Sequence, residues 1–356
     1  GLAVIELEYY RTVTNPTMVP ILAFLSLRWL DRPVRFVIFG GIGVLLILVG
    51  IWGANHALLK PFEKSGKPLL DTIHSYRRRE RGVNVVVIGG GHGQATLLRG
   101  LKQYTHNITA IVTVADTGGS SGDLRRNLGV LPPGDIRNCL AALSSDEALL
   151  SQVFQYRFKS GTGLEGHSLG NLLITALGEI TGSFEDAVME SGKVLAIYGQ
   201  VLPSTLTNVQ LVGELEDPET GEIRRIVGES ELTNTPGRIH RVWLDPANTP
   251  AYPPAISAIL NADLILIGPG SLFTSLLPNL LVGGLADAIQ SSHAEKYFIC
   301  NVATERGETE GFNASDHLKV IEQHLGRDLF DLVICNRNFR GKLGANAEWV
   351  VADMVL

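Results

Sequence analysis

Residues 83–93 read VNVVVIGGGHG, and this stretch decides the fold. The β-branched run Val83–Ile88 ends in a glycine turn, and the helix-forming sequence QATLLRGLK follows from Gln94. A buried strand, a glycine turn and the start of a helix form the first unit of a nucleotide-binding α/β fold. Glycine lets backbone approach a pyrophosphate, which then faces the N–H groups of the first helical turn. The G-x-G-x-x-G pattern is incomplete, since Gln94 takes its third glycine position, so a simple tight turn stays an alternative.

A second strand and turn follow the first. The apolar run Ile108–Val114 leads into Asp116 and then GGSSG at residues 118–122. An acid at the end of the second strand, 27 residues after Gly89, is where dinucleotide-binding folds place the carboxylate that binds the ribose. Asp116 could instead cap the next helix or hold a metal ion. The GGSSG run offers backbone and hydroxyl donors to an anion, and it would face the same crevice as the first turn.

A third strand, Asp263–Ile267, leads into GPGS at residues 268–271. Ser271 beside two glycines at the start of a helix is typical of a phosphate-binding turn. The chain lacks a G-x-x-x-x-G-K-[ST] motif, so it is not a Walker P-loop ATPase. Further strands are predicted at Tyr297–Val302 and Leu332–Cys335, and a β-hairpin insertion at about 195–250. The predicted fold is therefore α/β, with a Rossmann-like, mostly parallel sheet.

Two more motifs carry polar residues at helix starts. In LPPGDIRN, at 131–138, Asp135 is placed to cap a helix, and Arg137 and Asn138 are candidate ligands of a phosphate or carboxylate. Residues 166–170 read GHSLG, the G-x-S-x-G pattern of serine hydrolases. That pattern requires a buried strand before the serine, and the preceding RFKSGTGLE is polar, so we reject hydrolase chemistry. His167 and Asn171 are instead expected at a helix N-terminus that faces a ligand.

The N-terminal part has a different composition. Residues 36–54, FVIFGGIGVLLILVGIWGA, are uncharged and close to the length that a helix needs to cross a bilayer, so we predict a transmembrane helix there. Residues 1–35 are predicted to be an amphipathic segment, whose apolar run Val19–Leu27 suits an interfacial helix or a second short span. Residues 55–82 form a basic linker, and its arginines favour a cytoplasmic position for the globular part, residues 83–356.

Charge and cysteine content exclude several classes of protein. The net charge is −6, with 11 basic and 6 acidic residues in 1–82 and 19 basic and 30 acidic residues in 83–356. The globular part therefore lacks the basic surface that nucleic-acid binding needs. The three cysteines, Cys139, Cys300 and Cys335, are far apart and predict neither a disulfide framework nor a zinc site.

Together, VIGGGHG, ADTGGSSGDLR, LPPGDIRNCL, GHSLGNLLI and GPGSLFTSLLPNLLV resemble the YvcK-like gluconeogenesis-factor family, within the CofD-like superfamily of 2-phospho-L-lactate transferases. The resemblance covers residues 83 to about 340. It implies a protein linked to cell shape and gluconeogenic growth that binds a UDP-sugar or another nucleotide diphosphate. The transferase branch implies an alternative, an enzyme that moves a phospholactyl group from a guanylylated donor to a deazaflavin acceptor with Mg²⁺. A dimer is also implied. A nicotinamide-dependent oxidoreductase is poorly supported, because the dinucleotide motif is incomplete.

The motifs and the resemblance together give one set of candidate site residues. Asp116 and Asp135 are the candidate catalytic residues, and Asp116 and Asp123 are the candidate Mg²⁺ ligands. The predicted nucleotide-binding residues are Gly89, Gly90, Gly91, His92, Gly93, Asp116, Gly118, Gly119, Ser120, Ser121, Arg137, Asn138, His167, Asn171, Gly268, Gly270 and Ser271.

Overall fold

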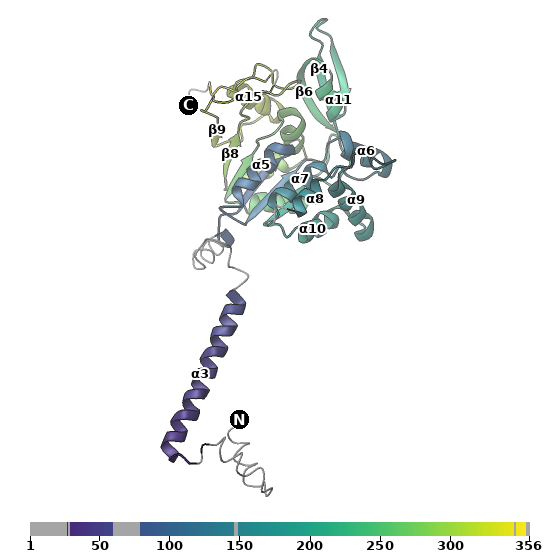
Figure 1. The fold of residues 1–356 in the computed structure, drawn as a ribbon. Helices are drawn as coiled ribbons and strands as arrows, with labels where there is room; N and C mark the ends of the chain where they lie inside the picture. The colour runs from purple at the N-terminus through teal and green to yellow at the C-terminus, as the bar shows by residue number, and fades with distance from the viewer. Residues whose placement is uncertain (1–26, 28, 60–78, 146–148, 345–346, 354–356) are drawn as a thin grey trace. The chain divides into compact units, whose positions relative to one another are not determined.

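A computed structural model describes residues 27, 29–59, 79–145, 149–344 and 347–353. The chain divides into two units, Gly1–Ser75 and Tyr76–Leu356. Most of the predicted amphipathic segment, residues 1–26 and 28, and most of the basic linker lie outside the described residues. The first unit contributes one described helix and the second contributes the globular part (Figure 1).

The helix of the first unit, α3, spans Arg32–Leu59. Residues Arg32–Ala57 have a mean hydropathy of 2.5 over their most apolar window, none of which is buried. At 1.5 Å per residue these 26 residues extend about 39 Å, more than the ~30 Å of a bilayer's hydrocarbon core. By length and composition α3 can cross a membrane, and it contains the whole predicted span, residues 36–54.

The globular part is built on a six-stranded parallel sheet in the order β3-β2-β1-β7-β8-β9. Short runs rich in Val, Ile and Leu form its central strands, which are buried because helices cover a parallel sheet on both faces. The strands are β1 (Val85–Gly89), β2 (Ile108–Val112), β3 (Gln200–Pro203), β7 (Leu264–Ile267), β8 (Glu295–Ile299) and β9 (Leu332–Ile334). The predicted mostly parallel α/β fold is confirmed. Each observed strand that the sequence predicted is shorter than the apolar run from which it was predicted.

Helices connect these strands and pack against them (Figure 1). They are α5 (Gly91–Leu101), α6 (Gly119–Leu128), α7 (Gly134–Leu143), α8 (Leu150–Gln155), α9 (Leu169–Thr181), α10 (Phe184–Val194), α12 (Pro253–Leu260), α13 (Leu277–Leu280), α14 (Leu285–Ser291) and α15 (Ala314–Leu325). A single π-helical turn, η2 (Leu272–Leu276), precedes α13. Such turns are rare and occur often at functional sites.

The predicted insertion is an antiparallel sheet of three strands, in the order β5-β4-β6. Its elements are β4 (Gln210–Glu216), β5 (Ile223–Val227), α11 (Glu229–Asn234) and β6 (Arg238–Asp245). The expected hairpin is the β4–β5 pair, to which β6 adds a third strand on the other edge of β4. The predicted start at about residue 195 is too early, because β3 belongs to the parallel sheet.

Candidate functional site

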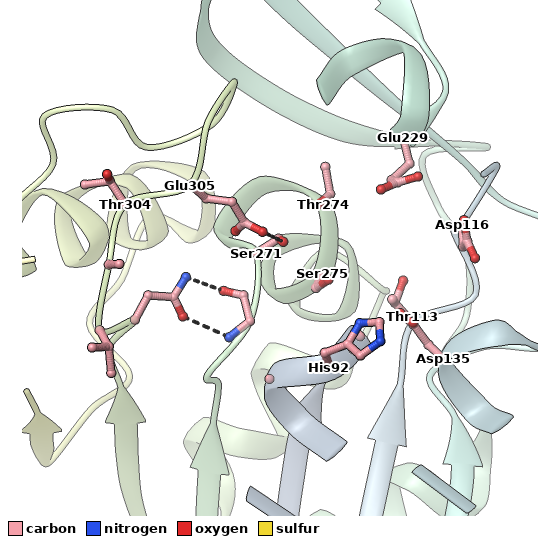
Figure 2. A pocket seen from close by; sticks show the side chains of 17 residues that line it. His92, Thr113, Asp116, Asp135, Glu229, Ser271, Thr274, Ser275, Thr304 and Glu305 are labelled. Carbon is pink, nitrogen blue, oxygen red and sulfur yellow. Dashed lines mark hydrogen bonds between the residues drawn. The ribbon is translucent and has the colours of Figure 1, made fainter. Parts of the chain in front are cut away.

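The strand order of the parallel sheet reverses between β1 and β7. Open α/β sheets bind ligands at such a switch point, beyond the carboxyl ends of the strands. A cavity of about 470 Å³ lies there, and its walls follow the ends of β1, β2, β7 and β8 (Figure 2). It is lined by Gly90, Gly91, His92, Gly93, Thr113, Asp116, Asp135, Glu229, Gly270, Ser271, Thr274, Ser275, Asn301, Val302, Ala303, Thr304 and Glu305. We call it the switch-point cavity.

The first glycine turn packs against its neighbours without room for side chains. A Cβ atom on Gly90 would stand 2.7 Å from Oδ2 of Asp135, and one on Gly93 would stand 2.6 Å from the carbonyl oxygen of Pro269. Gly91 has a φ of +63°, which favours glycine, although a Cβ there would meet open space. Gly93 therefore allows the turns after β1 and β7 to come together, and Gly90 allows the first turn to approach Asp135 of α7, so that these turns form the floor of the cavity.

Three carboxyl groups from separate elements gather on one side of the cavity: Asp116 after β2, Asp135 in the first turn of α7, and Glu229 at the start of α11 (Figure 2). Burial and the charge of Asp116 raise the pKa of Asp135 to about 7. Burial also raises the pKa of Asp116, and burial together with Asp116 raises that of Glu229. None of the described residues that line the cavity is Lys or Arg. The cavity is therefore acidic, and its carboxylates repel one another.

The turn after β7 forms the opposite wall. The Asn301 side chain donates to the carbonyl oxygen of Gly270 at 3.0 Å and accepts from its N–H at 3.1 Å. Ser271 Oγ donates to Oε1 of Glu305 at 2.7 Å (Figure 2). Behind this wall, Glu308 accepts from the Phe273 N–H at 3.0 Å. The side chains of Asn301 and Glu305 thus accept from Gly270 and Ser271, two residues that the sequence predicted as phosphate donors.

The second predicted turn, GGSSG, does not line the cavity. Asp116 Oδ1 accepts from the Gly118 N–H at 2.7 Å, so the turn holds this carboxylate in place. Ser120 Oγ lies 3.0 Å from Nδ1 of His167 and accepts from the Asn171 side chain at 3.0 Å. These bonds join the N-termini of α6 and α9. The hydroxyl donors predicted for a ligand are therefore used inside the protein.

Other predicted residues also serve this internal network or the sheet. The buried Arg137 donates to Ser168 Oγ and to Oδ1 of Asn138, and none of the three lines the cavity. The carbonyl oxygen of Gly89 accepts from the Asn279 side chain at 2.7 Å, and Gly268 bonds through its N–H to Ile88. The remaining predicted residues outside the cavity lining are Gly118, Gly119, Ser120, Ser121, His167 and Asn171.

Asp123, the second predicted Mg²⁺ ligand, lies away from the cavity. It is an exposed residue of α6 and forms an ion pair with Arg126 one turn later on the same helix. Helix α6 begins between Asp116 and Asp123, so only Asp116 of the two candidate ligands lines the cavity. Within the described ranges, no group of three or more His, Cys, Asp or Glu side chains is arranged to hold a metal ion.

Several lining residues were not predicted. Thr113 and Asn301 come within two residues of the ends of β2 and β8, so the rule that ligands bind beyond strand ends could have indicated them. Thr274 and Ser275 follow the predicted Ser271 in the same turn. Glu229 had no sequence signal, because it reaches the cavity from the antiparallel insertion.

A family model described as 2-phospho-L-lactate transferase CofD matches residues 85–354. The chain belongs to the CofD family. A gluconeogenesis factor from Halalkalibacterium halodurans is 52% identical over 251 residues, which are 70% of this chain and 76% of that protein. The gluconeogenesis factor of Bacillus subtilis is 49% identical over 252 residues, 71% and 78% of the two chains. The predicted resemblance to CofD-like gluconeogenesis factors is confirmed.

The fold is shared with a solved relative. A crystal structure of a protein from Bacillus halodurans matches with a TM-score of 0.71 at 48% identity, covering 77% of this chain and 88% of that one. A relative from Nostoc sp. is 53% identical over 308 residues, which are 85% of this chain. The match spans 65% of that relative's length.

Proposed function

We propose that this CofD-family protein is a membrane-tethered factor that binds a nucleotide sugar, such as a UDP-sugar, in the switch-point cavity. The observation that carries this proposal is the position of the cavity, beyond the carboxyl ends of β1 and β7 where the strand order reverses. The Gly91–Gly93 backbone at the start of α5 lies at its floor, where a diphosphate would face the helix N-terminus. In line with the names of its relatives, the protein would act in gluconeogenic growth.

The acidity of the cavity points to a cation that accompanies the diphosphate. Burial and the charge of Asp116 raise the pKa of Asp135, as expected where carboxyl groups share a small space. Their oxygen donors suit Mg²⁺, which proteins often hold through one or two carboxylates plus the phosphates of the substrate. We infer that Asp116 and Asp135 would hold this ion, which would neutralise the phosphate charge when bound. Asp123 has no part in this arrangement, because it is paired with Arg126.

One observation favours the transferase as a second candidate function. Asp135 is a partly buried residue that lines the cavity, and its pKa is raised to about 7. A carboxyl group with a pKa near the working pH is suited to accept a proton from an attacking hydroxyl group. In a phospholactyl transfer from a guanylylated donor, Asp135 would take the proton of the acceptor hydroxyl as its oxygen bonds to the phospholactyl phosphorus, and guanosine monophosphate would leave. The remaining cavity residues would position the two substrates.

The N-terminal unit supports the membrane part of the proposal. Helix α3 is long and apolar enough to span a bilayer, and most of its large apolar side chains are exposed. We propose a single span, with the globular part on the cytoplasmic side. The globular part would then meet its ligand in the cytoplasm, as a homodimer.

Thermal unfolding of the full chain in detergent micelles tests the proposed ligand. A ligand at about 100 times its Kd stabilises the folded state by roughly 2.7 kcal/mol. We expect UDP-sugars with Mg²⁺ to raise the unfolding midpoint and guanine nucleotides to leave it unchanged. A midpoint that rises with guanine nucleotides, together with turnover of a deazaflavin acceptor, would establish the transferase instead. A midpoint that responds to neither class would refute both proposals.

A further inference from the structure

A second and larger cavity, of about 1070 Å³, lies between the insertion and α15. Its walls are the segment that joins α11 to β6, the loop of residues 306–312 and the exposed side of α15. We call it the insertion groove. Its volume is in the range of small-molecule sites. It is separate from the switch-point cavity, and the two share no lining residue.

The charged residues that line the insertion groove are Arg238, Arg306, Lys319, Glu308, Glu310 and Asp316. The acids are bonded within the protein. Oε1 of Glu310 accepts from the Gly307 N–H at 2.6 Å, and Glu308 accepts from the Phe273 N–H and Thr274 Oγ1. Asp316 accepts from the Asn313 N–H at 3.0 Å and from Lys319 at 3.2 Å. This leaves Arg238 and Arg306 as the charges that face the groove without a partner among the described residues.

These two guanidinium groups come from different elements. Arg238 begins β6, and Arg306 lies on the loop after β8. Both side chains are exposed, and neither forms a hydrogen bond or an ion pair with any other described residue. A planar guanidinium group can donate two parallel hydrogen bonds to a pair of phosphate oxygens. Two arginines that line one groove therefore suit a ligand that offers several phosphate oxygens.

The two cavities differ in charge: the insertion groove is lined by three basic and three acidic residues, whereas the described residues that line the switch-point cavity include Asp and Glu but neither Lys nor Arg. A bare phosphate would therefore be repelled from the switch-point cavity. The insertion groove has two free arginines, and its acids are already bonded. A phosphorylated compound without a bound cation would therefore select the groove.

We propose that the insertion groove binds a small phosphorylated metabolite, recognised by Arg238 and Arg306, at a site distinct from the switch-point cavity. The loop that carries Arg306 also contains Glu305, which lines the switch-point cavity and accepts from Ser271. The ligand in the groove would thus contact the loop that shapes the first site.

Equilibrium dialysis of the full chain in detergent micelles with labelled inorganic pyrophosphate tests this site. EDTA is present, so that pyrophosphate is not delivered to the acidic cavity as a metal complex, and ionic strength is held constant. We expect saturable binding of one pyrophosphate per chain. The Arg238→Gln/Arg306→Gln variant should bind at least tenfold more weakly. Binding should be unchanged in Asp116→Asn, which alters only the switch-point cavity.

The matched control is Arg337→Gln/Arg340→Gln, which removes the same charge from two exposed arginines that line neither cavity. It should bind like the unmodified chain. Unfolding midpoints measured for all variants test whether each one is folded, as we expect for the arginine changes because those positions are exposed. Absence of saturable binding, equal weakening in both double variants, or loss of binding in Asp116→Asn would overturn the proposal. None of these results depends on whether the first cavity binds a nucleotide sugar.

Discussion

Thr274 Oγ1 donates a hydrogen bond of 2.7 Å to Glu308, a residue 34 positions later in the chain. The same carboxyl group accepts from the Phe273 N–H at 3.0 Å. Thr274 lines the switch-point cavity and Glu308 lines the insertion groove, so this bond joins the walls of the two cavities. A buried acid in this position makes the stability of the site depend on pH.

The first prediction concerns that pH dependence. Burial and Glu305 raise the pKa of Glu308 from 4.5 to about 7, so the folded state keeps a proton that the unfolded chain loses. The free energy of unfolding therefore falls as pH rises from about 4.5 to 7, by on the order of 3 kcal/mol from this group. Asp135, with a pKa of about 7, adds a fall in the same direction from about pH 4.

We expect Glu308→Gln to reduce this slope, because glutamine does not ionise. Chemical denaturation at pH 5 and pH 8 measures the difference in unfolding free energy. Glu310→Gln, at an exposed position in the same loop, is the control and should keep the slope of the unmodified chain. Equal slopes in all three proteins would show that Glu308 has an ordinary pKa.

Gly90→Ala should damage the floor of the switch-point cavity. The added Cβ would stand 2.7 Å from Asp135 Oδ2 and 3.0 Å from Cγ2 of Thr113, so the Asp135 carboxyl group must move from its position in the cavity. We expect a lower unfolding midpoint and at least tenfold weaker nucleotide-sugar binding. Gly100→Ala is the matched control, since its Cβ meets nothing within 4 Å inside α5, and it should stabilise the protein by about 0.5–1 kcal/mol. Gly90→Ala binding as tightly as the control would contradict the close packing.

The parallel sheet could be predicted from the sequence because its strands are short apolar runs, two of which, β1 and β7, lead directly into glycine turns. The same logic brought Gly90–Gly93, Asp116 and Ser271 to one cavity, since the ends of neighbouring parallel strands must meet. It failed for Ser120 and Arg137, because a donor at a helix start looks the same in sequence whether it bonds a ligand or another helix. Glu229 could not be predicted from the sequence, because the insertion's position over the cavity depends on tertiary packing.

Asp135→Asn should stabilise the protein without ligand and abolish its response to a Mg²⁺–nucleotide complex. At pH 8 the partly buried Asp135 is ionised, and removing that charge should add on the order of 2–4 kcal/mol to the unfolding free energy. The asparagine oxygen can still accept from the Gly91 N–H. Thermal unfolding with and without the complex measures both effects. Asp123→Asn changes a residue outside the cavity and should keep the full ligand response. Loss of that response in Asp123→Asn would show that Asp123 is a ligand of the ion.

Two charges in α3 should release the protein from the membrane. Leu46 and Leu48 are exposed apolar residues in the middle of the helix. Arginine at the centre of a spanning helix costs about 2.5–3.5 kcal/mol on insertion scales. We therefore expect Leu46→Arg/Leu48→Arg to move much of the protein from the carbonate-washed membrane pellet to the supernatant, and Leu46→Ile/Leu48→Ile to leave it in the pellet. Unmodified protein in the supernatant would contradict a span.

The last prediction links the two cavities through the loop of residues 304–311. Glu305 binds Ser271 in the switch-point cavity, Arg306 faces the insertion groove, and Glu308 holds Thr274. Gly307, at a φ of +81°, packs where a Cβ would stand 2.6 Å from the carbonyl oxygen of Thr233, so the loop has little freedom to absorb a shift of Arg306. A ligand on Arg306 should therefore change how Ser271 and Thr274 are held.

We expect saturating pyrophosphate to change the Kd of the nucleotide sugar by about 5-fold or more, the lower end of measured allosteric couplings. Because coupling is reciprocal, the nucleotide sugar must change the Kd of pyrophosphate by the same factor. Both constants can be measured by calorimetry with Mg²⁺ activity held fixed, since pyrophosphate itself binds the ion. Arg306→Gln should remove the effect of pyrophosphate while leaving the nucleotide-sugar Kd of the unmodified chain. If both ligands bind and neither alters the other, the loop does not transmit the change, and the two sites act independently.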